Sequence, residues 1–193
     1  MEYARIAPIM GRLWSPIAVV TSHWQGKSNA QIAVAIAAAS IVPDMPRVLL
    51  QIYKTNYSHD LIYNSGCFAL NFLRQDQLEL INDFGLVSGR DRDKLLGVAH
   101  APRATGSPVL DDCWGFLDCR VVNAMDGGDM TCFLGDVLDG ETLSQAEPLY
   151  WRDARREIPA AWNEEWDRKI SGEIEVSKRR MPNLDFKPWQ PKA

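Results

Sequence analysis

Short apolar segments separated by turn-forming residues cover most of the chain. Five strand-like segments span residues 17–22, 47–52, 67–73, 115–123 and 131–139, and turn signals bound each of them. Gly127, Gly128 and Asp129 lie between the last two and predict a hairpin, because glycine adopts the positive φ that such a loop needs. Many short strands with few long helices favour a barrel or sandwich over a parallel sheet.

Two helices are predicted between these strands. Residues 56–64 begin with the capping candidates Asn56 and Ser58 and end just before Gly66, the residue type most common after a helix. Residues 77–84 place Leu78, Leu80, Ile81 and Phe84 on roughly one helical face.

The chain changes character after Pro148. A stripe with a four-residue period predicts an amphipathic helix, which has to cover its own barrel or a partner subunit; the stripe is Trp162, Trp166, Ile170 and Ile174. The last dozen residues are proline-rich and predict an irregular tail. We therefore divide the chain into a barrel of residues 1–150 and a C-terminal helical extension and tail of residues 151–193.

Residues 29–40 carry two competing signals. Their alanine content favours a helix, whereas the alternation of Ile32, Val34 and Ile36 favours a strand. A strand that breaks into a tight turn near Ser40 fits both signals. Its other face would carry only alanines, which leaves room either for a flat ligand or for close packing against a neighbouring strand.

Composition narrows the class of protein. The 193 residues are 46% hydrophobic and 24% charged, with a net charge of -4, typical of a globular domain without a basic nucleic-acid footprint. The longest apolar stretch, residues 32–39, is too short to span a bilayer, so we expect a cytoplasmic protein without a membrane segment. The four cysteines lack C-x-x-C spacing and nearby histidines, so we expect no metal site.

Residues 52–60 are the strongest candidate for ligand chemistry. A strand ends, Lys54 follows, and a helix opens at Asn56 and Tyr57. Free N–H groups and the helix dipole attract phosphate at such a terminus, and Lys54, Ser58 and His59 would add further contacts. The alternative is plain N-capping by Asn56 or Ser58.

The loop of residues 88–94 is a second basic segment. Ser88, Gly89, Arg90 and Lys94 are typical of a solvated surface loop, or of one that contacts an anionic ligand. The chain contains no G-x-S-x-G, P-loop or G-x-G-x-x-G motif, and its three histidines are scattered. No catalytic residue is assigned on this basis.

An ordered series of short motifs resembles the flavin reductase-like proteins, which include flavoredoxins and the reductase components of two-component monooxygenases. The resemblance covers roughly the first three-quarters of the chain. The motifs are Pro16 with residues 18–22, Asn29, residues 40–42 with Pro46, residues 57–62, residues 65–73, residues 84–85, residues 88–91, residues 93–94, residues 108–110 and residues 133–137.

This resemblance implies a mainly β fold, a six-stranded antiparallel Greek-key FMN-binding split β-barrel with flanking helices, assembled as a homodimer. It implies FMN, with FAD as the other possible flavin, near the subunit interface. The isoalloxazine and ribityl groups would contact Thr21, Ser22, Asn29, Ser40 and Ile41. The phosphate would contact Lys54, Asn56, Tyr57, Ser58 and His59, and the loop carrying Ser88, Gly89, Arg90 and Lys94 would approach the flavin, often from the partner subunit.

The implied reaction is hydride transfer from NADH or NADPH to flavin N5, followed by reduction of free flavin or another acceptor. One departure bears on it: many family members have Gly-Asp-His where this chain has Gly128, Asp129 and Met130, and methionine neither donates a hydrogen bond nor carries charge. The alternative is therefore an electron-transfer flavoprotein that a partner protein reduces. A tetrapyrrole-binding split barrel is a third hypothesis.

Overall fold

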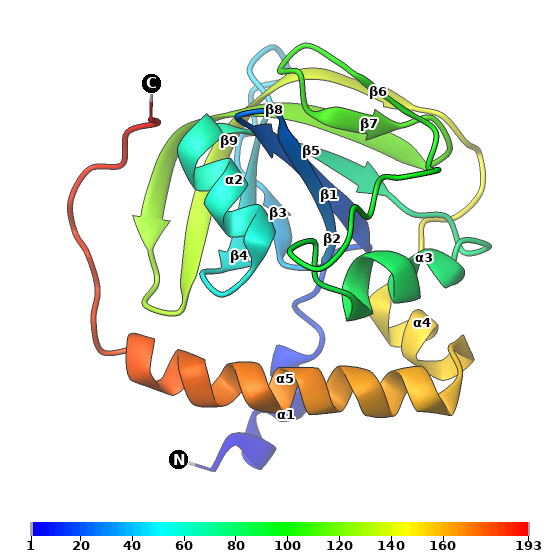
Figure 1. The fold of residues 1–193 in the computed structure, drawn as a ribbon, viewed down its shortest axis with the longest axis vertical. Helices are drawn as coiled ribbons and strands as arrows, with labels where there is room; N and C mark the ends of the chain where they lie inside the picture. The colour runs from blue at the N-terminus through cyan, green and yellow to red at the C-terminus, as the bar shows by residue number, and fades with distance from the viewer. Residues whose placement is uncertain (1, 193) are drawn as a thin grey trace.

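The computed structural model describes residues 2–192 and contains a strongly curled antiparallel sheet with helices around it (Figure 1). Its seven strands follow the order β2-β1-β5-β8-β9-β4-β3. The strands are β1 (Ala18–Trp24), β2 (Lys27–Ala33), β3 (Ile36–Ala38), β4 (Arg47–Tyr53), β5 (Cys67–Phe72), β8 (Gly115–Asp126) and β9 (Met130–Thr142). The short strands β6 (His100–Pro102) and β7 (Pro108–Leu110) form a separate ribbon.

The five predicted strands and the β8–β9 hairpin are confirmed, and Gly128 has the expected positive φ, at 89°. The predicted count of six strands is wrong by one, because residues 29–40 break into β2 and β3. Only Val34 and Ala35 separate these strands, yet they occupy opposite edges of the sheet. A two-residue link between opposite edges requires the sheet to curl almost closed.

The helices agree in part with the sequence prediction. α2 (Tyr57–Ser65) is confirmed and ends at Gly66, which is left-handed with a φ of 71°. The helix predicted over residues 77–84 is wrong in its form: α3 (Glu79–Ile81) is a single turn, followed by a π turn over Asn82–Leu86. At the N-terminus, a 3-10 turn (Tyr3–Arg5) precedes the short α1 (Ala7–Met10).

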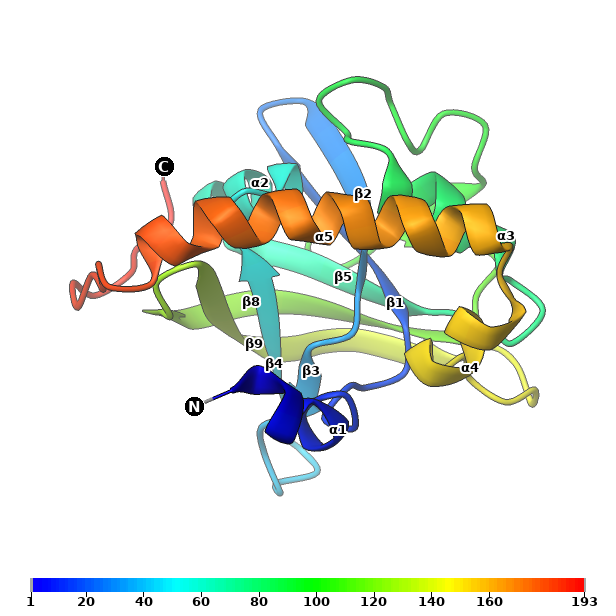
Figure 2. The same ribbon diagram turned by 90° about the horizontal axis from the view of Figure 1, so that it is seen from below.

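The C-terminal segment forms α4 (Trp151–Glu157) and α5 (Ala160–Arg180), and α5 runs across one end of the curled sheet (Figure 2). The predicted helix is confirmed, whereas α4 was not predicted. Trp162 and Trp166 pack on a buried cluster that also contains Ile17, Val19 and Phe84. The extension thus shares a hydrophobic core with the barrel strands. Within residues 2–192, no helix has the length and apolarity to cross a membrane.

Candidate functional site

Polar groups from three distant segments meet at the start of α2. Asn29 of β2 donates from Nδ2 to the Ser58 Oγ atom of α2 at 2.8 Å, and both side chains are buried. The loop of residues 88–94 covers them: a Cβ atom on Gly89 would lie only 1.8 Å from Asn29 Oδ1. This position therefore accommodates only glycine unless the loop or the Asn29 side chain shifts.

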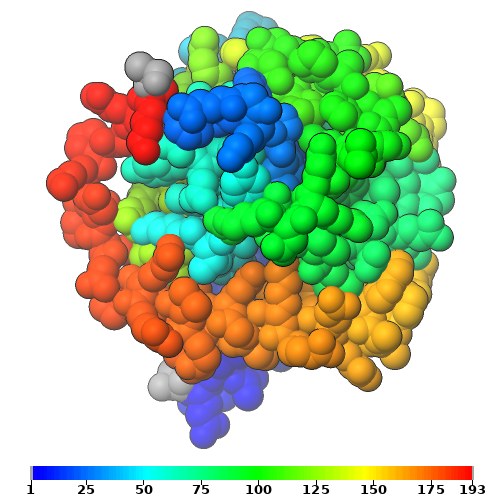
Figure 3. Space-filling view, viewed as in Figure 1, coloured from blue at the N-terminus to red at the C-terminus, as the bar shows by residue number. Residues whose placement is uncertain are grey.

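Arg90 fastens the same loop to α2. Its guanidinium donates to the Thr55 carbonyl oxygen at 3.0 Å and to Asp60 Oδ2 at 2.8 Å, and lies 5.3 Å from the centre of the Tyr57 ring. In the space-filling view the loop (green) and α2 (cyan) adjoin on the face above α5 (orange) (Figure 3). The loop and the helix terminus thus form one continuous surface.

The N-terminus of α2 has the features of an anion site. Asn56 occupies the N-cap position, yet no side chain within residues 2–192 caps the helix. The buried Thr55 Oγ1 atom has no hydrogen-bond partner in that part of the chain. Uncapped N–H groups, the positive end of the helix dipole and a free hydroxyl lie beside the half-exposed Arg90 guanidinium. Such a combination fits a phosphate group.

Lys54 and His59 face the β8–β9 hairpin instead. Lys54 Nζ donates to Asp126 Oδ1 at 2.6 Å. Burial raises the pKa of the Asp126 carboxyl, but hydrogen bonds from Lys54 and from backbone N–H groups outweigh burial and hold this pKa below its ordinary value. His59 Nε2 lies 2.8 Å from Thr131 Oγ1, and burial lowers the His59 pKa, which favours the neutral imidazole.

Of the residues expected along the isoalloxazine and ribityl groups, only Asn29 lies at the start of α2, and Ser22 reaches the other end of the helix, 3.3 Å from Ser65 Oγ. The Thr21 and Ser22 hydroxyls are buried and donate to the carbonyl oxygens of Pro108 and Cys67. Ser40 and the fully exposed Ile41 lie before β4, whereas α2 follows β4. Among the expected residues, the structure brings together Asn29, Asn56, Tyr57, Ser58, Ser88, Gly89 and Arg90.

Lys94 closes the far end of the loop. Its buried Nζ donates to the Phe84 carbonyl oxygen at 2.8 Å. Burial and, to a smaller extent, the nearby charges of Lys169 and Arg92 together lower the pKa of Lys94 to about 7. The same turn binds a second lysine, because Lys169 Nζ donates to the Gly85 carbonyl oxygen at 2.6 Å.

Sequence reasoning did not identify Thr55, Asp60 or Lys169. Asp60 follows Asn56 by one helical turn, but its partner Arg90 is 30 residues away in sequence. Lys169 comes three residues after Trp166 and so lies on the same side of α5. That spacing was visible in the sequence, although its target, the Gly85 carbonyl, was not.

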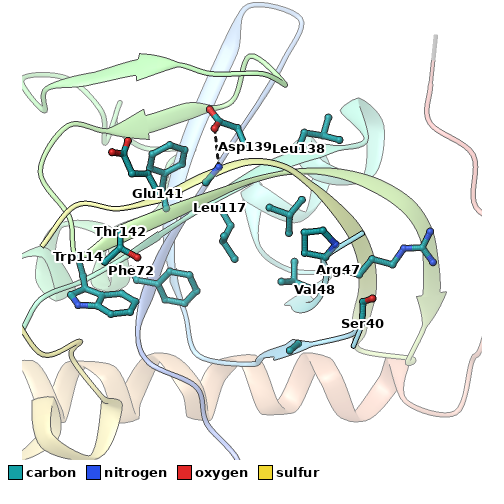
Figure 4. Close-up of a pocket in the computed structure, with 16 residues that line it drawn as sticks. Ser40, Arg47, Val48, Phe72, Trp114, Leu117, Leu138, Asp139, Glu141 and Thr142 are labelled. Atoms are coloured by element: carbon teal, nitrogen blue, oxygen red, sulfur yellow. Dashed lines mark hydrogen bonds between the residues drawn. The ribbon is translucent and has the colours of Figure 1, made fainter. Parts of the chain in front are cut away.

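A groove of about 670 Å³ opens elsewhere on the sheet, between β4, β8 and β9 (Figure 4). Phe72, Leu117 and Val48 line its apolar floor, with Trp114 at one end and Arg47 at the other. Ser40 lies on its rim, so this predicted site residue belongs to the groove and not to the α2 cluster.

The chain is similar to several known proteins. Residues 10–159 match the flavin reductase like domain family. A ferric-chelate reductase (NAD(P)H) of Archaeoglobus fulgidus is 31% identical over 137 residues, covering 70% of this chain and 80% of the relative. A high molecular weight rubredoxin of Moorella thermoacetica is 30% identical over 143 residues, covering 72% of this chain. The alignment spans only 62% of the rubredoxin's own length.

Among solved structures, nitrilotriacetate monooxygenase component B from Mycobacterium thermoresistibile superimposes with a TM-score of 0.65. It is 27% identical, and the match covers 76% of this chain and 80% of that one. The shared split-barrel fold confirms the predicted architecture. Because this family match covers most of its length, the chain belongs to the flavin reductase-like family.

Proposed function

We propose that the chain binds FMN and catalyses NAD(P)H-dependent reduction of flavin or another acceptor. The observation that carries this proposal is the uncapped N-terminus of α2 beside Arg90, in a chain of the flavin reductase-like family. The phosphate would accept hydrogen bonds from the backbone N–H groups of Tyr57 and Ser58 and from the Thr55 hydroxyl. Arg90 would neutralise part of its charge.

Asn29 lies between α2 and the loop of residues 88–94. It holds Ser58 Oγ and contacts Gly89, so it fixes the distance between α2 and the loop. FAD is the other possible flavin, and a competition titration of FMN against FAD separates the two. Lys54 and His59 bind the hairpin in this structure, so in the proposal they stabilise the hairpin next to the phosphate.

A bound flavin would supply the redox chemistry by accepting hydride at N5. The protein's task is then to orient the flavin, exclude water and admit the donor, and no side chain needs to act as an acid or base. Met130 opens β9 opposite Tyr53. Because its thioether cannot donate a hydrogen bond to the carboxamide of NAD(P)H, we expect the donor to be held mainly by shape.

The apolar groove supports a homodimer. Phe72, Leu117 and Val48 line the groove with apolar side chains. On the loop between β3 and β4, Ile41 and Met45 are 100% and 61% exposed. Ser40 and Pro46, at the two ends of that loop, line the groove, and apolar side chains exposed beside a groove are typical of interaction sites. The variant Leu117→Glu should therefore shift the protein toward monomer in light scattering, whereas Lys27→Glu, at the exposed start of β2, should not.

The decisive test is anaerobic reduction of the FMN-loaded protein. Wild-type protein reconstituted with FMN and mixed with NADH or NADPH should lose its flavin absorption without any other reductant. Flavin that stays oxidised until dithionite is added would contradict nicotinamide use. A protein that takes up no FMN would contradict the proposal as a whole.

Met130 favours a second candidate function. If methionine at this position prevents productive binding of NAD(P)H, the protein is an electron-transfer flavoprotein that a partner redox protein reduces. In that case Met130→His should create NADH oxidation where the wild type has none. Equal and negligible rates in both proteins would leave the residue without influence on donor choice and contradict this explanation.

A further inference from the structure

We propose that α5, which follows the family's matched segment, positions the loop of residues 88–94 and thereby sets the affinity for the flavin phosphate. The inference deepens the proposed flavin site and rests on it. Its basis is a pair of contacts between α5 and the π turn that leads directly into this loop, made by Trp166 and Lys169.

Trp166 leaves no space above Gly85. A Cβ atom added to Gly85 would lie 2.4 Å from Trp166 Cζ3, so the indole rests directly on the backbone of the π turn. Lys169 Nζ donates to the carbonyl oxygen of the same glycine at 2.6 Å and lies 5.9 Å from the centre of the Trp166 ring. The aromatic contact and the charged donor together hold Gly85 from one side of α5.

The helix itself is well anchored. Arg155 of α4 forms two hydrogen bonds with Asp167 of α5, at 2.9 and 3.1 Å. The Trp151 and Trp166 rings are 4.5 Å apart. These contacts fix α5 relative to α4, so the side chains of α5 that contact the π turn are held in place.

The loop transmits the position of Gly85 to the phosphate site. Gly89, four residues after Gly85, packs so closely on Asn29 that a Cβ atom would not fit. The next residue, Arg90, donates hydrogen bonds to Thr55 and Asp60. At the other end, Lys94 returns to the Phe84 carbonyl oxygen. Both ends of the loop are therefore tied to the same turn. Release of Gly85 should loosen the placement of the Arg90 guanidinium, which lies beside the N-terminus of α2 where the phosphate is proposed.

The variant Lys169→Met tests this coupling, with Lys169→Arg as the conservative rescue and the exposed neighbour Arg168→Met as the matched control. The probes are FMN and riboflavin, which differ in the phosphate. We expect Lys169→Met to weaken FMN binding about tenfold, the effect of one lost charge-assisted hydrogen bond, and to leave riboflavin binding unchanged. Lys169→Arg should restore most of the FMN affinity, and Arg168→Met should resemble the wild type.

Amide hydrogen exchange supplies a readout that needs no flavin. Residues 87–94 should exchange faster in Lys169→Met than in Arg168→Met. Unchanged exchange there would overturn the coupling, as would an equal loss of FMN and riboflavin affinity, which indicates general destabilisation. A wild-type protein that binds neither flavin would refute the proposed flavin site and with it the effect on affinity. Faster exchange in that protein would still show that α5 holds the loop.

Discussion

The contact between Gly89 and Asn29 gives the sharpest prediction. In Gly89→Ala, the new Cβ atom would lie 1.8 Å from Asn29 Oδ1, whereas Cβ contacts under 3.0 Å are essentially never seen. The loop or Asn29 must therefore move by at least 1.2 Å, the difference between these two distances. Asn29 is buried and held by Ser58, so overpacking should lower the free energy of unfolding by roughly 1–3 kcal/mol.

A double-mutant cycle in urea isolates this contact. In the Asn29→Ala background the clashing amide is absent, and Gly89→Ala should then cost less than about 0.5 kcal/mol. Gly172→Ala is the control, because its Cβ meets nothing within 4 Å in the middle of α5, where alanine should stabilise by roughly 0.5–1 kcal/mol. An equal cost of Gly89→Ala with and without Asn29 would refute the loop placement.

Three further predictions concern charge and the redox donor. Lys94 has a pKa of about 7 in the folded protein, so the unfolded chain binds more protons between pH 7 and the ordinary lysine pKa. Relative to Lys94→Met, the wild type should gain about 2 kcal/mol of unfolding free energy from pH 6.5 to 9, measured by urea denaturation; a flat difference would contradict the burial of the ammonium. Asp126 has a lowered pKa and binds Lys54. Its contribution to the free energy of unfolding is therefore present above the pKa of the carboxyl in the unfolded chain, and is lost as the pH falls through its pKa in the folded protein. Asp126→Ala should therefore cost roughly 1–3 kcal/mol at pH 7 and progressively less in acid-titrated melts, and a pH-independent cost would count against the ion pair. If the donor binds beside Met130, Met130→His should raise kcat/KM for NADH in stopped-flow assays several-fold, which corresponds to about 1 kcal/mol; an unchanged value would place the donor elsewhere.

Local signals in the sequence predicted the parts of the fold that local geometry determines. Gly66 after α2 and Gly128 in the hairpin both adopt the positive φ that glycine tolerates best. The sequence predicted a break near Ser40, just after β3 ends, but not the earlier break at Val34 and Ala35 that creates the extra strand, because that break depends on closure of the whole sheet. The helix over residues 77–84 gave way to a π turn at Gly85, where Trp166 rests.

From residue patterns alone, the candidate site was predicted only where it coincides with a helix terminus, whereas Asn29, Gly89 and Arg90 were expected from the family resemblance. Residues 56–58 were identified correctly as a terminus with polar groups, because capping patterns are local. The directions of Thr21, Ser22 and Lys54 were not predictable, since each hydroxyl or ammonium found a partner far away in sequence, such as Pro108 or Asp126. Residue type identifies possible donors, and only the fold determines what they face.

A crystal structure of the protein with FMN tests the central claim most directly. We predict the phosphate at the N-terminus of α2, within hydrogen-bond distance of the backbone N–H groups of Tyr57 and Ser58 and of the Arg90 guanidinium. A phosphate bound at another part of the barrel, or protein crystals that contain no flavin after growth in excess FMN, would contradict it.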